Sequence, residues 1–137
     1  WRLGYAVASK EIIGNMNKVQ QHTISHPTTF AMYGGVAALK GPQECIEEMR
    51  AEFERRRAFV LKSMDEMGLS YAPADGAFYA YVKVDGDDAE VANRWLEQGH
   101  VAVTHGSAFN HPGWVRLSYA ASMDRLQEAM SRISAVL

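Results

Sequence analysis

Two arginines stand inside short apolar stretches that are typical of β-strands. Arg2 is the centre of the triplet Trp-Arg-Leu, and Arg116 is the centre of the triplet Val-Arg-Leu. Because side chains alternate between the two faces of a strand, each arginine would point away from its apolar neighbours. A guanidinium in that position can bind a carboxylate or a phosphate through two parallel hydrogen bonds, or it can reach solvent at a strand edge. The pattern leaves both interpretations open.

The spacing of the other reactive residues gives little support to metal or nucleophilic chemistry. No histidine has a companion at metal-site spacing on one helix face, and the single cysteine, Cys45, is remote from them. No Ser-His-Asp or Cys-His arrangement can be defined from the sequence. The glycine-bearing segments 34–36 and 105–109 lack the strand-to-helix context of a phosphate loop. We therefore predict no metal site. The histidines are His22, His26, His100, His105 and His111.

The composition indicates one globular domain with room for an appended segment. The chain has 137 residues, of which 47% are hydrophobic. Lys and Arg number 14 and Asp and Glu number 16, so there is no basic field that would attract nucleic acid or an anionic membrane. The lone cysteine cannot form an internal disulfide, and we expect a cytoplasmic protein with small-molecule or protein partners. No apolar run approaches the roughly 18 to 20 residues of a membrane-spanning helix, although a segment before Trp1 could carry a targeting signal.

The first 41 residues predict one strand and two helices. Residues 1–9 combine aromatic, β-branched and small side chains and end in a serine, which indicates a strand followed by a capped helix from Lys10. Pro27 interrupts the helical pattern, because it has no amide hydrogen to donate. A second helix over 28–39 is expected to end at Gly41.

A long helix is predicted between Pro42, which suits a first helical turn, and Gly68, which can close a C-terminus in left-handed geometry. About 25 residues at 1.5 Å each would span roughly 37 Å, a length typical of helices that bridge two structural units. One face of this helix is apolar. Its members are Ile46, Met49, Phe53, Val60, Met64 and Met67.

The remaining residues predict a compact β-β-α-β-β-α unit. Strands are expected from Leu69, over 77–84, over 100–104 and over 113–120, with a loop over 105–112. Asp87 or Asp88 would cap the first helix, which buries Val91 and Trp95 and ends at Gly99. Ser122 would cap the second, whose apolar face is Leu126, Met130, Ile133 and Leu137.

Three stretches, taken in order, resemble the C-terminal third of class I/II pyridoxal-phosphate-dependent aminotransferases of the aspartate aminotransferase type. These stretches are "WRLGYAVAS", "DGAFYAYVKV" and "VAVTHGSAFN…GWVRLSYA". The resemblance implies an α/β fold, namely the small C-terminal domain of a fold type I enzyme preceded by a long linking helix and the tail of the large domain. It places the large-domain remnant in 1–41 and the helix with the small domain in 42–137.

The resemblance also implies roles for both arginines. Arg2 matches the family's arginine that binds the phosphate of pyridoxal 5'-phosphate, and Arg116 matches the arginine that binds the substrate α-carboxylate. The Schiff-base lysine, the aspartate at the pyridine nitrogen and the aromatic residue on the cofactor ring lie upstream in this family. Lys10 and Lys18 follow Arg2 and do not match that lysine, so we expect no catalytic residue in this chain.

Two residues in one loop depart from the family's pattern. His105 precedes Gly106 where proline is common, and Asn110 follows Phe109 where glycine is common. These departures raise the question of whether the loop near the substrate keeps its geometry.

The resulting expectation is a fragment of an enzyme that moves an amino group between an amino acid and a 2-oxo acid, inactive by itself and part of a homodimer when complete. Two alternatives stay open. One is another fold type I enzyme, such as a carbon–sulfur lyase or a synthase, since these reuse both arginines. The other is a non-catalytic ligand-binding α/β module.

Overall fold

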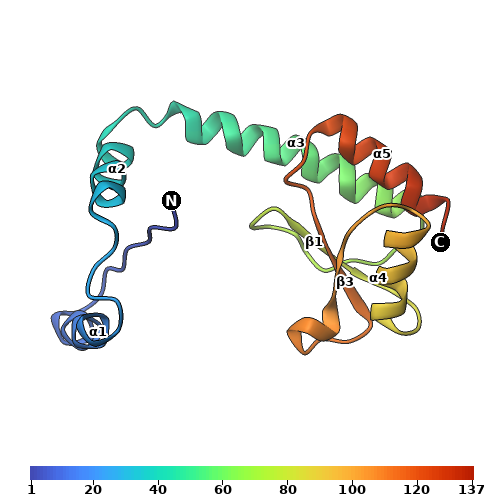
Figure 1. Cartoon of the computed structure of the whole chain (residues 1–137). Helices are drawn as coiled ribbons and strands as arrows, with labels where there is room; N and C mark the ends of the chain where they lie inside the picture. Colours follow the sequence, from blue (N-terminus) through green and yellow to red (C-terminus); the bar gives the residue numbers. More distant parts are fainter. The chain divides into compact units, whose positions relative to one another are not determined.

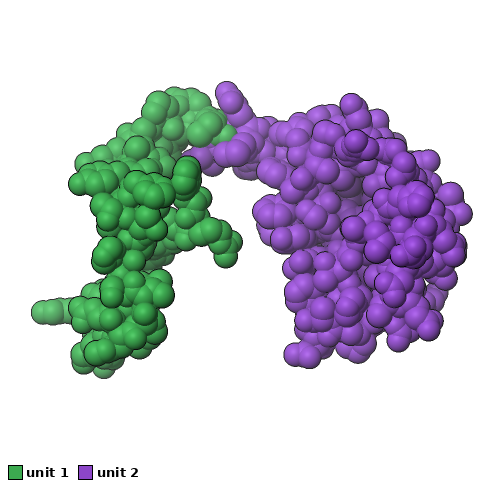
Figure 2. Space-filling model, viewed as in Figure 1, with its two compact units in different colours: residues 1–45 green, residues 46–137 purple.

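The computed structural model describes residues 1–137 and divides them into two compact units, shown in Figure 2. Unit 1 comprises residues 1–45 and unit 2 comprises residues 46–137. The long helix α3, Glu44–Glu66, begins at the end of unit 1 and runs on into unit 2 (Figure 1).

Unit 1 contains the two expected helices but not the expected strand. Helix α1 covers Lys10–Thr23, and helix α2 covers Thr29–Lys40 with Gly41 as its C-cap. The hydroxyl of Ser9 accepts a hydrogen bond from the Ile12 amide at 3.4 Å, so the predicted cap is confirmed. The strand predicted over 1–9 is wrong. A strand requires a paired neighbour, none of the three strands in the chain pairs with this segment, and Arg2 has a left-handed φ of 59°.

In unit 2, helix α3 packs through only part of its predicted apolar face. Val60 and Met64 are buried in the core, whereas Ile46 and Met49 are more than half exposed. Gly68 has a φ of 72°, as expected for the residue that closes this helix.

A three-stranded antiparallel sheet organises unit 2, with the spatial order β1-β3-β2. The strands are β1 Tyr79–Lys83, β2 Thr104–His105 and β3 Trp114–Ser118. Register pairs Ala80 with Leu117 and Val82 with Val115, and all four side chains are buried. Helices α3, α4 (Asp88–Glu97) and α5 (Met123–Ser134) contribute to the same core, so one sheet face is covered by helices (Figure 1).

The α/β class is confirmed, but two predicted strands are shorter than expected. The strand from Leu69 is reduced to a bridge between Tyr71 and Val82. The Ala72 amide still donates to the Tyr81 carbonyl at 2.9 Å, but the next residue, Pro73, has no N–H to donate. Of the strand predicted over 100–104, only Thr104 is in a strand, the short β2.

The predicted helix ends in unit 2 are largely confirmed. Asp87 caps α4, since its carboxylate accepts hydrogen bonds from the Ala89 and Glu90 amides at 2.8 and 3.1 Å. The Ser122 hydroxyl accepts from the Arg125 amide at 3.4 Å and caps α5. None of the helices combines the length and apolar character needed to cross a bilayer.

Candidate functional site

Arg116 occupies the middle of the central strand. Register places it opposite Tyr81 on β1 and opposite Thr104 on β2. Its neighbours Val115 and Leu117 are buried in the helical core, so alternation directs Arg116 to the other face of the sheet. The strand position expected for this arginine is therefore confirmed.

The guanidinium of Arg116 lies between two aromatic rings. Its Cζ is 4.3 Å from the ring centroid of Tyr79 and 4.4 Å from that of Phe109. Such contacts attract the cation to the ring faces and fix the plane of the guanidinium. Arg116 forms no ion pair or hydrogen bond with another side chain. Its N–H groups are therefore available to an anion from outside the chain.

Phe109 is supplied by a single 3₁₀ turn, η1, over Gly106–Phe109. A Cβ on Gly106 would lie 2.7 Å from the Tyr81 hydroxyl and 2.8 Å from the Trp114 carbonyl oxygen, so the turn has no space for a side chain there. Asn110 closes the turn with a φ of 56°, a left-handed conformation that asparagine adopts more readily than most residues.

The two sequence departures are compatible with this turn. His105 has a φ of −67°, close to the angle that a proline ring would impose. Asn110 takes the left-handed geometry that would otherwise favour glycine. Both substitutions therefore preserve the backbone that presents Phe109.

The buried carboxylate of Asp88 anchors the turn. Asp88 is 3% exposed, and its oxygens accept hydrogen bonds from the Ser107 amide at 2.6 Å and the Ser107 hydroxyl at 2.7 Å. The hydroxyl bond is the main reason that the pKa of the Asp88 carboxyl lies below its usual range, against the opposing effect of burial. The amide of Ser107 and the nearby His105 lower this pKa further.

Arg2 lies in unit 1, where it lines an open hollow of about 890 Å³. Trp1 and Phe30, two other lining residues, contact each other edge to face with ring centroids 5.2 Å apart. Arg2 is exposed and has no ion-pair or hydrogen-bond partner. Its guanidinium is therefore also available to an anion.

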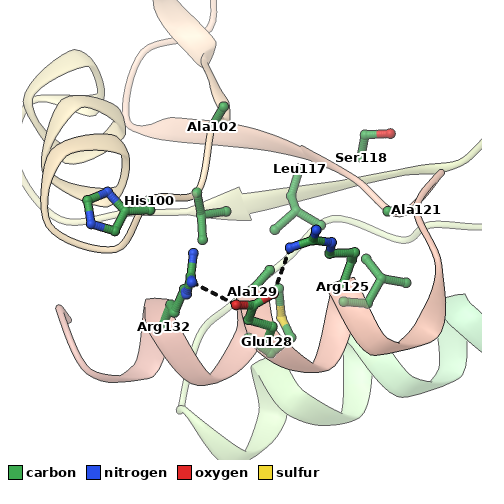
Figure 3. Close-up of a pocket in the computed structure, with 12 residues that line it drawn as sticks. His100, Ala102, Leu117, Ser118, Ala121, Arg125, Glu128, Ala129 and Arg132 are labelled. Atoms are coloured by element: carbon green, nitrogen blue, oxygen red, sulfur yellow. Dashed lines mark hydrogen bonds and ion pairs between the residues drawn. The ribbon is translucent and has the colours of Figure 1, made fainter.

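A separate pocket of about 250 Å³ lies beside α5, where Leu117 and Ala129 contribute to its lining (Figure 3). Its charged groups already pair with one another. Glu128 accepts hydrogen bonds from Arg125 at 3.1 Å and from Arg132 at 2.7 Å. The arginines of this pocket are thus partly neutralised, unlike Arg116. No group of three or more His, Cys, Asp or Glu side chains is placed to hold a metal ion.

The comparisons to known proteins identify the family of this chain. The model of the family "Aminotransferase class I and II" matches residues 1–133. The chain belongs to this family. Aminotransferase relatives include the aspartate aminotransferase of Thermotoga maritima, 42% identical over 97% of this chain and 34% of that protein. The aromatic-amino-acid aminotransferase 2 of Thermococcus litoralis is 36% identical over 100% of this chain and 37% of that protein.

Solved aminotransferase structures share the fold. The Thermotoga maritima aspartate aminotransferase matches with a TM-score of 0.88 at 39% identity, over 94% of this chain and 34% of that one. The Thermus thermophilus aspartate aminotransferase with maleate matches with a TM-score of 0.92 at 36% identity, over 100% of this chain and 37% of that one. The chain therefore spans about a third of the length of the aminotransferases that it matches.

Sequence inspection missed the residues that hold Arg116 in place. Alternation puts Tyr79 on the same face as Arg116, but the contact between them requires the β1–β3 register. The consecutive residues Asp87 and Asp88 do indicate a tertiary hydrogen bond. A helix needs only one N-cap, so the second carboxylate is left for another partner. Nothing in the spacing indicates that this partner is Ser107.

Proposed function

We propose that this chain is the carboxylate-binding part of an aminotransferase, which moves an amino group between an amino acid and a 2-oxo acid. Arg116 binds the α-carboxylate that both substrates carry. The observation that supports this role is the guanidinium held between Tyr79 and Phe109 with no acidic partner in the chain. The relative solved with maleate, a dicarboxylate, supports the same chemistry.

We propose that the complete enzyme uses pyridoxal 5'-phosphate, as the family resemblance implies. The chain's residues fit its phosphate, because Arg2 is exposed, unpaired and lines an open hollow. A permanently charged fork of N–H donors matches a phosphate well. When bound, this cofactor supplies the electron sink for chemistry at the amino acid's α-carbon.

The contribution of this chain to the reaction is binding and orientation. Two parallel hydrogen bonds from Arg116 would hold the carboxylate in one plane and so fix the direction of the α-carbon's other bonds. Such orientation can lower a barrier by several kcal/mol. We further propose that residues 1–41 belong to the large domain and 42–137 to the linking helix and small domain, in a cytoplasmic homodimer.

The experiment that tests this function is a product assay on the enzyme that contains this chain. Amino-acid-dependent conversion of an added 2-oxo acid into its amino acid is the expected result. Release of ammonia and pyruvate without that conversion would identify a lyase instead and contradict the proposal. Relatives named for aspartate and for aromatic amino acids have similar identity to this chain, so both substrate classes belong in the assay.

A further inference from the structure

The position of Phe109 requires an explanation outside the hydrophobic core. The residue is 47% exposed, yet the centroid of its ring lies 4.4 Å from the Cζ of Arg116. A residue that keeps almost half of its surface exposed is not held in place by packing alone. The backbone of the η1 turn must therefore decide where the ring lies.

That backbone is fixed at its second residue by Asp88. Both carboxylate oxygens are used on one partner, the amide and the hydroxyl of Ser107. These charge-assisted bonds are short and run from the first turn of α4 to a residue 19 positions away in the chain. They connect the helix to the turn, and neither residue forms a hydrogen bond or ion pair with the Arg116 side chain.

We propose that Asp88 is a positioning residue for carboxylate binding: through Ser107 it sets the η1 turn, and the turn places Phe109 against Arg116. This inference rests on the proposed function of Arg116. Loss of the Asp88–Ser107 link leaves Phe109 free to leave the guanidinium, which then loses one of the two rings that define its plane. This loss weakens substrate binding and leaves the rate of the chemical step unchanged.

The neighbouring Asp87 provides a matched control. It lies beside Asp88 and caps the same helix, but its carboxylate bonds only to amides within α4. Asp87→Ala therefore weakens the helix without touching the turn. Any effect of Asp88 that Asp87→Ala reproduces is an effect of helix stability.

The test uses steady-state kinetics of the complete enzyme with an amino acid and a 2-oxo acid. We expect Asp88→Asn to raise KM for both substrates by up to about fivefold with little change in kcat, because one of two cation–π contacts is weakened, and Asp87→Ala to leave KM unchanged. Ser107→Ala should act in the same direction as Asp88→Asn, and Ser107→Thr, which keeps the hydroxyl, should restore KM. Where Asp88→Asn lowers the yield of folded enzyme, the Ser107 pair provides the same comparison.

A double-mutant cycle with Phe109→Ala decides between positioning and general destabilisation. If Asp88 acts through Phe109, adding Asp88→Asn to Phe109→Ala raises KM no further. An equal, additive rise in both backgrounds would overturn the inference. Arg116→Ala serves as the reference variant. If Arg116→Ala leaves KM unchanged, the proposed function of Arg116 fails. If Arg116→Ala raises KM but Asp88→Asn does not, only the positioning role of Asp88 is rejected.

Discussion

Arg116 lies directly opposite Tyr81 in the strand register, but its guanidinium stacks on Tyr79, two residues away along β1. This diagonal contact directs the arginine along the sheet rather than straight outward. A second ring, that of Phe109, reaches the guanidinium from a different segment. Both contacts are made to the planar group itself, and its N–H groups have no ion-pair partner in the chain.

The first prediction concerns the Tyr79 ring. Tyr79→Leu in the complete enzyme removes one cation–π contact, worth about 0.5–1 kcal/mol at a partly exposed site, and should raise KM for both substrates about two- to fivefold. Tyr79→Phe keeps the ring and should leave KM unchanged. Steady-state kinetics of the two variants measure this. A rise of the same size in Tyr79→Phe would show that the hydroxyl, not the ring, is responsible.

The second prediction concerns the space around Gly106. Gly106→Ala forces a Cβ against the Tyr81 hydroxyl and two carbonyl oxygens, so we expect about 1–3 kcal/mol of lost stability in urea unfolding. Gly76, where an added Cβ would meet no atom within 4 Å, is the matched control. Gly76→Ala should change the unfolding free energy by no more than about 0.5 kcal/mol. Equal effects at both glycines would contradict the crowding argument.

The third prediction compares two methionines on α3. Met64 is 2% exposed and Met49 is 56% exposed. Met64→Ala leaves a cavity in the core and should cost about 2–5 kcal/mol, whereas Met49→Ala should stay within about 0.5 kcal/mol. Urea denaturation of the chain measures both values. A larger loss at Met49 would mean that the buried face of the helix has been assigned to the wrong side.

The fourth prediction follows from the lowered pKa of Asp88. A carboxyl whose folded-state pKa is below its unfolded value of about 3.9 stabilises the fold fully above that pH, and this contribution disappears as the pH falls through the folded-state pKa. The stability gap between the wild type and Asp88→Asn should therefore be constant near neutral pH and shrink below about pH 4. Urea unfolding at a series of pH values from neutral to acid tests this. A gap that widens in acid would reverse the sign and refute the assignment.

The sequence predicts those parts of the structure in which residues interact with near neighbours in the chain, and it fails where the interacting residues are distant in the chain. Local signals were sufficient for the helices, because caps such as Ser9 and Ser122 bond to amides three residues away. The strand expected around Arg2 was wrong, because a strand exists only with a neighbour and no strand of this chain supplies one.

The residues around Arg116 likewise include some that the sequence predicts and some that it does not. Alternation along β3 correctly placed Arg116 on the face opposite Val115 and Leu117. The rings that fix its guanidinium come from Tyr79 and Phe109, which are separated from it by 37 and 7 positions and reach it only through tertiary structure. The hydrophobic periodicity of the sequence does not indicate these contacts.

The proposed function depends on Arg116 binding the α-carboxylate of the substrate. Its most direct test compares L-aspartate and L-tyrosine with 3-aminopropanoate and tyramine, the amines that lack this carboxylate, in single-turnover reactions of the complete enzyme. Arg116→Ala should lower the second-order rate constant about 100-fold for the amino acids and leave the rate constant for the amines unchanged. Arg125→Ala, which removes an arginine already paired with Glu128, should change neither. An equal fall for amino acids and amines, or no fall for either, would contradict this role of Arg116.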